Sequence, residues 1–352
     1  MATTPNRPPD PRRYFEAAGG ELTVVVDRPP VCLYLEVTNR CNLLCTTCPR
    51  TFEDLEPPTD MSWELFTRIV SQVPDLARVV LHGVGEPMMV RELPRMVRHL
   101  KGRGVHVLFN TNGTLLDARR GRELIEAGLD ELRVSLDAAE PGAFKLVRGV
   151  DAFERIVGNV KAFTALQRQL GAPLPRVSLW LTGLKETLAQ LPRFVELAHD
   201  LGVREVYLQR LVYFPGGQGL AQPESALFEN LDAEEQRTLR GAEEAARALG
   251  VTFNASGAVE PELSVKKGPG ERPWSLCRRP WTLMYFTATG RALPCCIAPF
   301  SLRGYSNFTL GDATQETLRE IWNGPRYQEF RRALASDRPP DSCASCGLRW
   351  SL

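Results

Sequence analysis

Short runs of β-branched and aliphatic residues alternate with longer stretches whose apolar positions recur every three to four residues between residues 31 and 249. The short runs predict strands, and the longer stretches predict helices with one apolar face. Strand alternating with helix indicates a parallel sheet covered by helices, so the predicted fold class is α/β. Predicted strands cover residues 31–37, 77–82, 105–110, 131–136, 176–181 and 205–210, and predicted helices cover residues 61–73, 90–101, 118–127, 151–167, 187–201 and 232–249.

These six strand–helix units are too few for a closed eight-unit barrel. In parallel α/β folds the chemistry lies at the carboxyl ends of the strands, so a site is expected in the segments that follow each strand. Two Gly- and Pro-rich passages, residues 214–223 and 256–273, interrupt the pattern. The second passage predicts a boundary before a tail that carries cysteines.

Composition excludes some partners. The 352-residue chain has a formal net charge of +1, which points to no nucleic acid partner. No apolar run is long enough to span a bilayer, so no membrane partner is expected. The Pro-rich start lacks the apolar core of a signal peptide, which predicts a cytoplasmic protein whose residues 1–30 form a flexible arm.

The cysteines form two groups. Of the nine cysteines, four lie in residues 32–48 and five in residues 277–346. Without a secretory signal, such cysteines favour metal binding over disulfides, and two separate groups predict two metal sites. Cys32 falls inside the first predicted strand and is expected to be a buried core thiol.

Three cysteines follow the first strand closely. Cys41, Cys45 and Cys48 have the spacing C-x3-C-x2-C. A structural zinc site uses four protein ligands, and a 4Fe–4S cluster also uses four thiolates. Three thiolates would leave one iron of a cluster open to another ligand. A zinc knuckle is the alternative interpretation of the same loop.

This loop, together with residues 35–40, resembles the signature of the radical S-adenosylmethionine (radical SAM) superfamily. The resemblance implies a partial (β/α)6 barrel and a 4Fe–4S cluster whose open iron is chelated by SAM. It implies that an electron from a donor such as flavodoxin or ferredoxin cleaves SAM to a 5′-deoxyadenosyl radical, which takes a hydrogen atom from the substrate. Thr47 departs from the family pattern, in which an aromatic residue often precedes the third cysteine.

Further motif residues follow the second and third strands. Gly83, Gly85, Glu86 and Pro87 resemble the family motif that holds the SAM amino group, and its glycines would let the backbone approach a ligand closely. Asn112 lies in an Asn- and Gly-rich segment after the third strand. It is interpreted either as a turn residue or as a residue close to SAM.

The fourth strand ends at Ser135 and Asp137, which a period of two would place on one face. The resemblance implies that they contact the ribose or amino-acid end of SAM. Arg148 resembles the arginine that pairs with the SAM carboxylate, a contact that suits a guanidinium. The alternative for Arg148 is a solvated surface position. Trp180 and residues 209–210 are candidates for the substrate side, and the sequence identifies no catalytic acid or base.

The tail pattern resembles the auxiliary iron–sulfur domain called SPASM, or its shorter form, twitch. Cys277 precedes a predicted hairpin with its turn at residues 289–290, and Cys295, Cys343 and Cys346 follow. Residues 310–334 share the resemblance, most clearly at residues 321–323. The expected division is an arm (1–30), a barrel (31–255), a linker (256–276) and an auxiliary domain (277–352).

Four thiolates complete the ligation of one 4Fe–4S cluster, so the tail predicts a second, auxiliary cluster without an open iron. Full SPASM domains carry more cysteines. Cys296 is the spare thiol, because adjacent side chains on a strand point in opposite directions. A zinc site with four cysteine ligands is the alternative.

Together these resemblances imply a radical SAM enzyme of oxidoreductase type. A single, fully ligated auxiliary cluster is similar to that of the aminosugar dehydrogenases of the group, which favours oxidation or rearrangement of a small molecule. A maturase that modifies a ribosomal peptide or protein side chain is the alternative. A non-catalytic metal-binding scaffold is a third, and the motifs at residues 83–87 and 135–137 speak against it.

Overall fold

The computed structural model describes residues 22–213, 217–257, 259–266, 273–301, 304, 308–344 and 346. Residues 1–21 of the predicted arm lie outside the described residues, as do parts of both Gly- and Pro-rich passages and most of residues 345–352.

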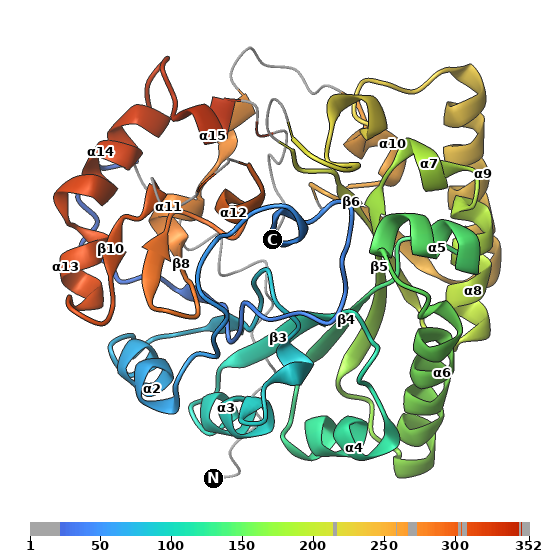
Figure 1. Ribbon diagram of the computed structural model, residues 1–352, viewed down its shortest axis with the longest axis horizontal. Coiled ribbons are helices and arrows are strands. Elements are labelled where there is room, and N and C mark those ends of the chain that lie inside the picture. The colour runs from blue at the N-terminus through green and yellow to red at the C-terminus, as the bar shows by residue number, and fades with distance from the viewer. Residues whose placement is uncertain are drawn as a thin grey trace, which may run out of the picture.

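One ten-stranded sheet runs through the middle of the molecule, with helices on its outer side (Figure 1). From β1 to β7 each strand pairs in parallel with the next one in the sequence. The predicted partial barrel of strand–helix units is confirmed, and β7 adds a strand that was not predicted. The strands are β1 (Cys32–Leu35), β2 (Arg78–Val80), β3 (His106–Thr111), β4 (Glu131–Ser135), β5 (Arg176–Gly183), β6 (Glu205–Arg210) and β7 (Thr252–Ala255).

The helices of the barrel follow the apolar periodicity with exceptions of two kinds. The short helices α5 and α10 were not predicted, and the helix predicted over residues 187–201 is divided into α7 and α8, where Pro192 lies in the first turn of α8. The helices are α2 (Trp63–Ser71), α3 (Leu93–Lys101), α4 (Ala118–Glu126), α5 (Pro141–Arg148), α6 (Phe153–Leu170), α7 (Lys185–Leu188), α8 (Leu191–Asp200), α9 (Ala233–Leu249) and α10 (Pro261–Ser264).

The two faces of the sheet pack into different clusters. Leu33 and Val79 belong to the large core with Phe66 of α2 on the helix side. Cys32 and Tyr34, which alternate with them, belong to a smaller cluster on the inner side. Cys32 is fully buried, which confirms the expected core thiol.

The C-terminal strands extend the same sheet. The strand β8 (Leu283–Phe286) pairs in parallel with β1, and β9 (Arg291–Leu293) pairs antiparallel with β8, so the predicted hairpin is confirmed. The strand β10 (Gly311–Asp312) follows at the edge. One continuous sheet includes strands from both the predicted barrel (31–255) and the predicted auxiliary domain (277–352). The boundaries between these domains remain predictions. The helices of this part are α11 (Arg279–Thr282), α12 (Ala298–Ser301), α13 (Leu318–Trp322), α14 (Pro325–Leu334) and α15 (Asp341–Ala344).

Residues 22–30 lie against these C-terminal helices. The side-chain amide of Asn323 accepts a hydrogen bond from the Val26 amide (2.9 Å) and donates one to the Val26 carbonyl (2.9 Å). The indole of Trp322 donates to the carbonyl of Arg28 (3.0 Å). Two of the residues that carried the SPASM resemblance, Trp322 and Asn323, thus hold the described end of the predicted arm.

Glu36 joins the barrel to the C-terminal hairpin. Its buried carboxylate accepts hydrogen bonds from the Val84 amide (2.9 Å), the Tyr285 hydroxyl (2.8 Å) and the Ala288 amide (3.2 Å). Burial raises the pKa of Glu36 to about 7, although these hydrogen bonds act in the opposite direction. One carboxyl group therefore links β1, the turn after β2 and the end of β8.

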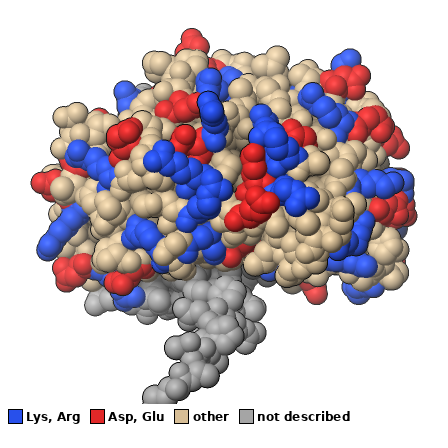
Figure 2. All heavy atoms as spheres, turned by 90° about the horizontal axis from the view of Figure 1, so that it is seen from below, with Lys and Arg blue, Asp and Glu red and all other residues tan. Residues whose placement is uncertain are grey.

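The face shown in Figure 2 carries basic and acidic side chains intermingled across the surface. This distribution agrees with the formal net charge of +1. In the part of the chain that the structure describes, no helix has the length and apolar composition needed to cross a bilayer.

The Glu36 carboxyl predicts a pH-dependent contribution to stability. Its pKa of about 7 in the folded state lies above the ordinary value of 4.5, so folding favours the protonated form. The resulting stability is fully present below about pH 4.5 and is lost as the pH rises through about 7. The variant Glu36→Gln should lack this decline when the free energy of unfolding is measured by denaturant titration from pH 5 to 8.

The control is Glu126→Gln, at an exposed position at the end of α4. It should keep the pH dependence of the unmodified protein. An equal decline with pH in the Glu36→Gln variant would contradict the role given to this carboxyl.

Candidate active site

The carboxyl ends of the barrel strands surround a cavity of about 210 Å³ on the inner side of the sheet. The structure brings together there almost every residue that the barrel motifs predicted. Pro87 does not line the cavity, and instead begins a short 3-10 helix, Pro87–Met89. The predicted residues that line it are Cys41, Cys45, Cys48, Gly83, Gly85, Glu86, Asn112, Ser135, Asp137 and Arg148.

The turn after β2 presses against β1 and the start of the cysteine loop. A Cβ atom on Gly83 would lie 2.2 Å from Cγ of Glu36, and one on Gly85 would lie 2.2 Å from the carbonyl oxygen of Thr38. The Glu86 amide also donates a hydrogen bond to the Arg40 carbonyl (2.8 Å). The sequence analysis expected these glycines to let the backbone approach a ligand. In the structure they also let the turn after β2 pack closely against β1 and the residues that follow it.

Two more glycines touch the cysteine loop from other elements. A Cβ atom on Gly149, after α5, would lie 2.2 Å from the carbonyl oxygen of Leu44, and one on Gly219 would lie 2.1 Å from that of Thr46. The Thr46 amide donates to the Val147 carbonyl (2.8 Å). Neighbouring segments therefore satisfy backbone groups of a loop that has no regular secondary structure of its own around its first two cysteines.

Glu86 holds the turns after β2 and β3 together. One carboxylate oxygen accepts hydrogen bonds from the Met88 amide (3.0 Å) and the Thr111 hydroxyl (2.7 Å), and the other accepts from the Asn112 amide (2.6 Å). Burial raises the pKa of Glu86, while these donors lower it. Both oxygens are engaged with the chain, so Glu86 supports the shape of the cavity wall.

Asn112 contacts the cysteine loop directly. Its side-chain nitrogen donates to the side-chain oxygen of Asn42 (2.8 Å) and lies 3.9 Å from the sulfur of Cys41. Its side-chain oxygen accepts hydrogen bonds from the amide and the hydroxyl of Thr114. Asn112 is thus fixed between the turn after β3 and the first cysteine.

Asp137 and Arg148, for which the sequence predicted separate contacts, form an ion pair with 2.6 Å between Oδ2 and Nε. Only 12% of the Arg148 side chain is exposed, so the surface alternative for Arg148 is wrong. Burial acts to lower the pKa of Arg148. Asp137 and the Cys45 sulfur, which lies 3.7 Å from Arg148 Nη1, outweigh burial and raise the pKa above its ordinary value. Asp137 has a φ of +60° and also accepts a hydrogen bond from the Thr182 amide (2.6 Å).

The three thiols fit an iron–sulfur cluster better than a single metal ion. Burial raises the pKa of the Cys48 thiol to about 12, so the thiolate form requires a metal. Among the described residues, no three side chains of His, Cys, Asp or Glu are close enough to hold one metal ion. A cluster binds each thiolate through a different iron, so its ligands lie farther apart than those of one zinc ion.

The opposite side of the cavity is aromatic and basic. Trp180 stacks on Tyr207 with 3.9 Å between the ring centroids, and the Arg133 guanidinium lies 4.5 Å from the Trp180 centroid. Arg133 lies two residues before Ser135 on β4, so the alternation of side chains along a strand would have placed it on the same face, toward the cavity. Arg279 and Cys296 come from the C-terminal segment, which no local pattern places here. The lining residues that the sequence analysis did not predict include Tyr34, His82, Arg133, Thr182, Arg279, Cys296, Ile297 and Phe300.

The four predicted auxiliary cysteines line one smaller cavity. Apolar side chains that include Phe330 and Leu334 surround it. Burial raises the pKa of Cys343, and the sulfurs of the other three cysteines raise it further, in agreement with their place around the same cavity. This donor set fits a fully ligated cluster. The four residues are Cys277, Cys295, Cys343 and Cys346.

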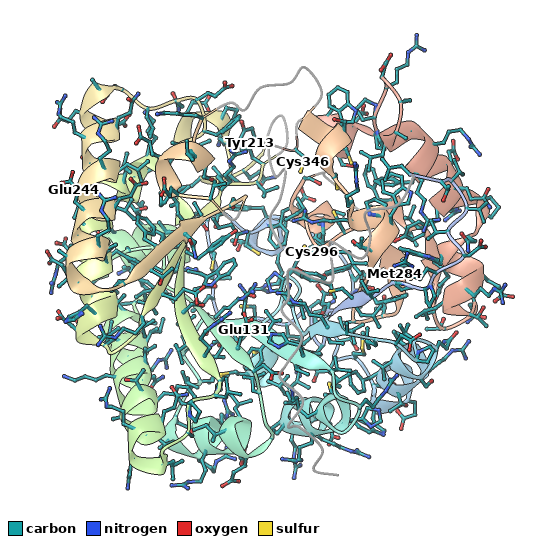
Figure 3. The ribbon with its side chains drawn as sticks, turned by 180° about the vertical axis from the view of Figure 1, so that it is seen from behind. Glu131, Tyr213, Glu244, Met284, Cys296 and Cys346 are labelled. Atoms are coloured by element: carbon teal, nitrogen blue, oxygen red, sulfur yellow. The ribbon has the colours of Figure 1, made fainter. Side chains whose placement is uncertain are left out.

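Cys296 lines the active-site cavity and is not among the residues that line the auxiliary cavity. In Figure 3 it lies near the middle of the molecule, between the barrel strands and the C-terminal elements. The assignment of Cys295 as the ligand and Cys296 as the spare thiol remains a prediction.

Family models match both parts of the chain. The radical SAM superfamily model matches residues 35–198, and the model of the SPASM iron–sulfur cluster-binding domain matches residues 277–347. The chain belongs to the radical SAM superfamily and carries a C-terminal SPASM domain. It is therefore an enzyme whose cofactors are SAM, the 4Fe–4S cluster that cleaves it and an auxiliary 4Fe–4S cluster.

Curated relatives cover most of the chain. The PqqA peptide cyclase of Gluconobacter oxydans is 29% identical over 325 residues, which are 90% of this chain and 83% of that protein. The tungsten-containing aldehyde ferredoxin oxidoreductase cofactor-modifying protein of Pyrococcus furiosus is 26% identical over 339 residues, 90% of this chain and 87% of that protein. PqqA peptide cyclases of further bacteria also match.

Among solved structures, Streptococcus suis SuiB bound to S-adenosylmethionine has the same fold. The TM-score is 0.67 at 17% sequence identity, and the match covers 86% of this chain and 68% of SuiB.

The contact of Gly149 with the cysteine loop predicts an unusually costly substitution. Gly149 and Gly171 both end a helix with a left-handed backbone, but a Cβ on Gly171 would have no neighbour within 4 Å. Gly171→Ala should cost about 1 kcal/mol through the backbone alone. Gly149→Ala should cost about 1–3 kcal/mol more because Leu44 must move.

Denaturant unfolding and iron content measure both effects. Gly149→Ala should also lower the iron bound by the SAM cluster, whereas Gly171→Ala should not. Equal losses of stability in the two variants would show that the contact with Leu44 is unimportant.

The two cysteine sets predict separate losses of iron. The reconstituted protein should hold about eight irons per chain, and Cys45→Ala and Cys295→Ala should each hold about four. Cys296→Ala is the matched control and should keep about eight, because its thiol faces the active-site cavity. Iron and sulfide analysis after anaerobic reconstitution checks this. Zinc in place of iron, or a loss of iron in Cys296→Ala alone, would contradict the assignment.

Proposed function

We propose that this enzyme is a peptide maturase, which uses the 5′-deoxyadenosyl radical to modify a side chain of a peptide or small protein. The similarity to PqqA peptide cyclase, along 90% of this chain and 83% of that protein, carries the proposal. The expectation of a small-molecule substrate rested on the single auxiliary cluster. The comparisons support the peptide alternative better.

The shape of the site also suits an extended substrate. A second cavity of about 270 Å³ adjoins the first, and Arg210, Leu211 and Val212 line both. A substrate that continues on one side of its reacting residue would occupy both cavities. Apolar side chains form part of its walls, namely Leu208, Ala226, Leu227, Phe228 and Val265.

The chain's own residues divide into three groups in this proposal. Cys41, Cys45 and Cys48 hold the cluster, which supplies reductive cleavage of SAM when it is bound. Gly83, Gly85 and Glu86, with Asn112 and Ser135, form the SAM side of the cavity, which the Asp137–Arg148 pair also lines. Trp180, Arg133 and Arg210 orient the substrate from the other side. The electron donor is proposed to be a flavodoxin or ferredoxin.

A cofactor-sized substrate is the second candidate. It is favoured by the similarity to the Pyrococcus furiosus protein, whose name describes modification of an enzyme cofactor. Such a molecule would also reach the aromatic wall at Trp180 and Tyr207.

The test uses peptides encoded by short reading frames beside the gene, synthesised with deuterated side chains. The reconstituted enzyme is incubated with SAM, dithionite and each peptide under anaerobic conditions. Mass spectrometry should find deuterium in 5′-deoxyadenosine together with a changed peptide mass, and Cys45→Ala should give neither. Deuterium that comes only from a cofactor-sized molecule would replace the proposal with the second candidate.

A further inference from the structure

Arg279 lies in the wall between the two cluster sites. It begins α11, two residues after Cys277, and is only 8% exposed. Its side chain lines the active-site cavity on one side and the auxiliary cavity on the other. Ile297 lines both cavities as well. At this point a single layer of side chains separates the two spaces.

The arginine charge lies next to the predicted cluster ligands. It interacts electrostatically most with the sulfur of Cys296, and then with those of the predicted ligands Cys295 and Cys277. A guanidinium keeps its proton at any pH that a protein experiences. Because the group is buried, salt in the solvent screens its charge little.

A fixed positive charge here acts on electron transfer. A 4Fe–4S cluster with four thiolates is negatively charged, and it gains a further negative charge on reduction. A nearby buried cation therefore stabilises the reduced cluster more than the oxidised one. Net charge, hydrogen bonds to sulfur and solvent exposure are the levers by which a protein sets such a potential.

Other arginines of the active-site cavity are placed differently. Arg133 and Arg148 line the active-site cavity but not the auxiliary cavity. Of the arginines that line the active-site cavity in the described part of the chain, Arg279 is the one that also lines the auxiliary cavity.

We propose that Arg279 is a positioning residue that raises the reduction potential of the auxiliary cluster held by Cys277, Cys295, Cys343 and Cys346. Because Arg279 lies in the wall that the two cavities share, the higher potential favours transfer of an electron from the active-site cavity to the auxiliary cluster. The inference does not depend on whether the substrate is a peptide or a small molecule.

The experiment is an anaerobic redox titration of the full-length, reconstituted protein, followed by electron paramagnetic resonance. The same titration on Cys45→Ala identifies the signal of the auxiliary cluster. Arg279→Gln should lower the potential of that cluster and leave the potential of the SAM cluster unchanged. Arg279→Lys, which keeps the charge, should stay near the original value.

Arg278→Gln is the matched control, because the neighbouring Arg278 side chain donates to the Ser275 carbonyl (2.9 Å) in an exposed contact. Arg278 also acts on the Cys277 thiol, but from an exposed position where solvent screens its charge, so Arg278→Gln should shift the potential of the auxiliary cluster less than Arg279→Gln does. If Arg279→Gln loses the second cluster while Arg279→Lys retains it, the need for a positive charge is supported. An unchanged potential in Arg279→Gln, an equal shift in Arg278→Gln, or loss of the cluster in both Arg279 variants would overturn the proposal.

Discussion

The site depends on how closely neighbouring backbones approach the loop that carries Cys41, Cys45 and Cys48. At Gly85 and Gly149, a single added carbon would meet a carbonyl oxygen of the loop at 2.2 Å. Backbone hydrogen bonds accompany both approaches. Because the loop around its first cysteines is irregular, its neighbours set its shape, and glycine is the residue type that permits such contacts.

The auxiliary domain is built into the same sheet as the barrel. The strand β8 pairs with β1, and the Glu36 carboxyl binds the turn after β2 and the end of β8 at once. This connection brings the C-terminal segment to the inner side of the barrel. Its consequence is a shared wall, in which Arg279 and Ile297 face both cavities.

Local patterns predicted much of the fold and the location of the site. The strands and most helices appear where apolar periodicity placed them, because one face of each is buried against the sheet. The short helices α5 and α10 and the strand β7 were missed, since none of them has a long periodic pattern and all three are stabilised by tertiary contacts. Likewise, Pro192 divides a helix that periodicity alone predicted to be continuous.

By itself, the sequence determined the class of chemistry, because ligand spacing and the order of strands and helices are local properties of the chain. The strand–helix alternation predicted the α/β barrel, and the resemblance of the cysteine motifs to known families implied a radical SAM enzyme with an auxiliary cluster domain. Only the tertiary structure paired Asp137 with Arg148 and turned Cys296 toward the active-site cavity. It also placed Arg279 between the two sites. Those contacts join segments that are far apart in the chain, and the packing of the whole sheet decides which of their side chains meet.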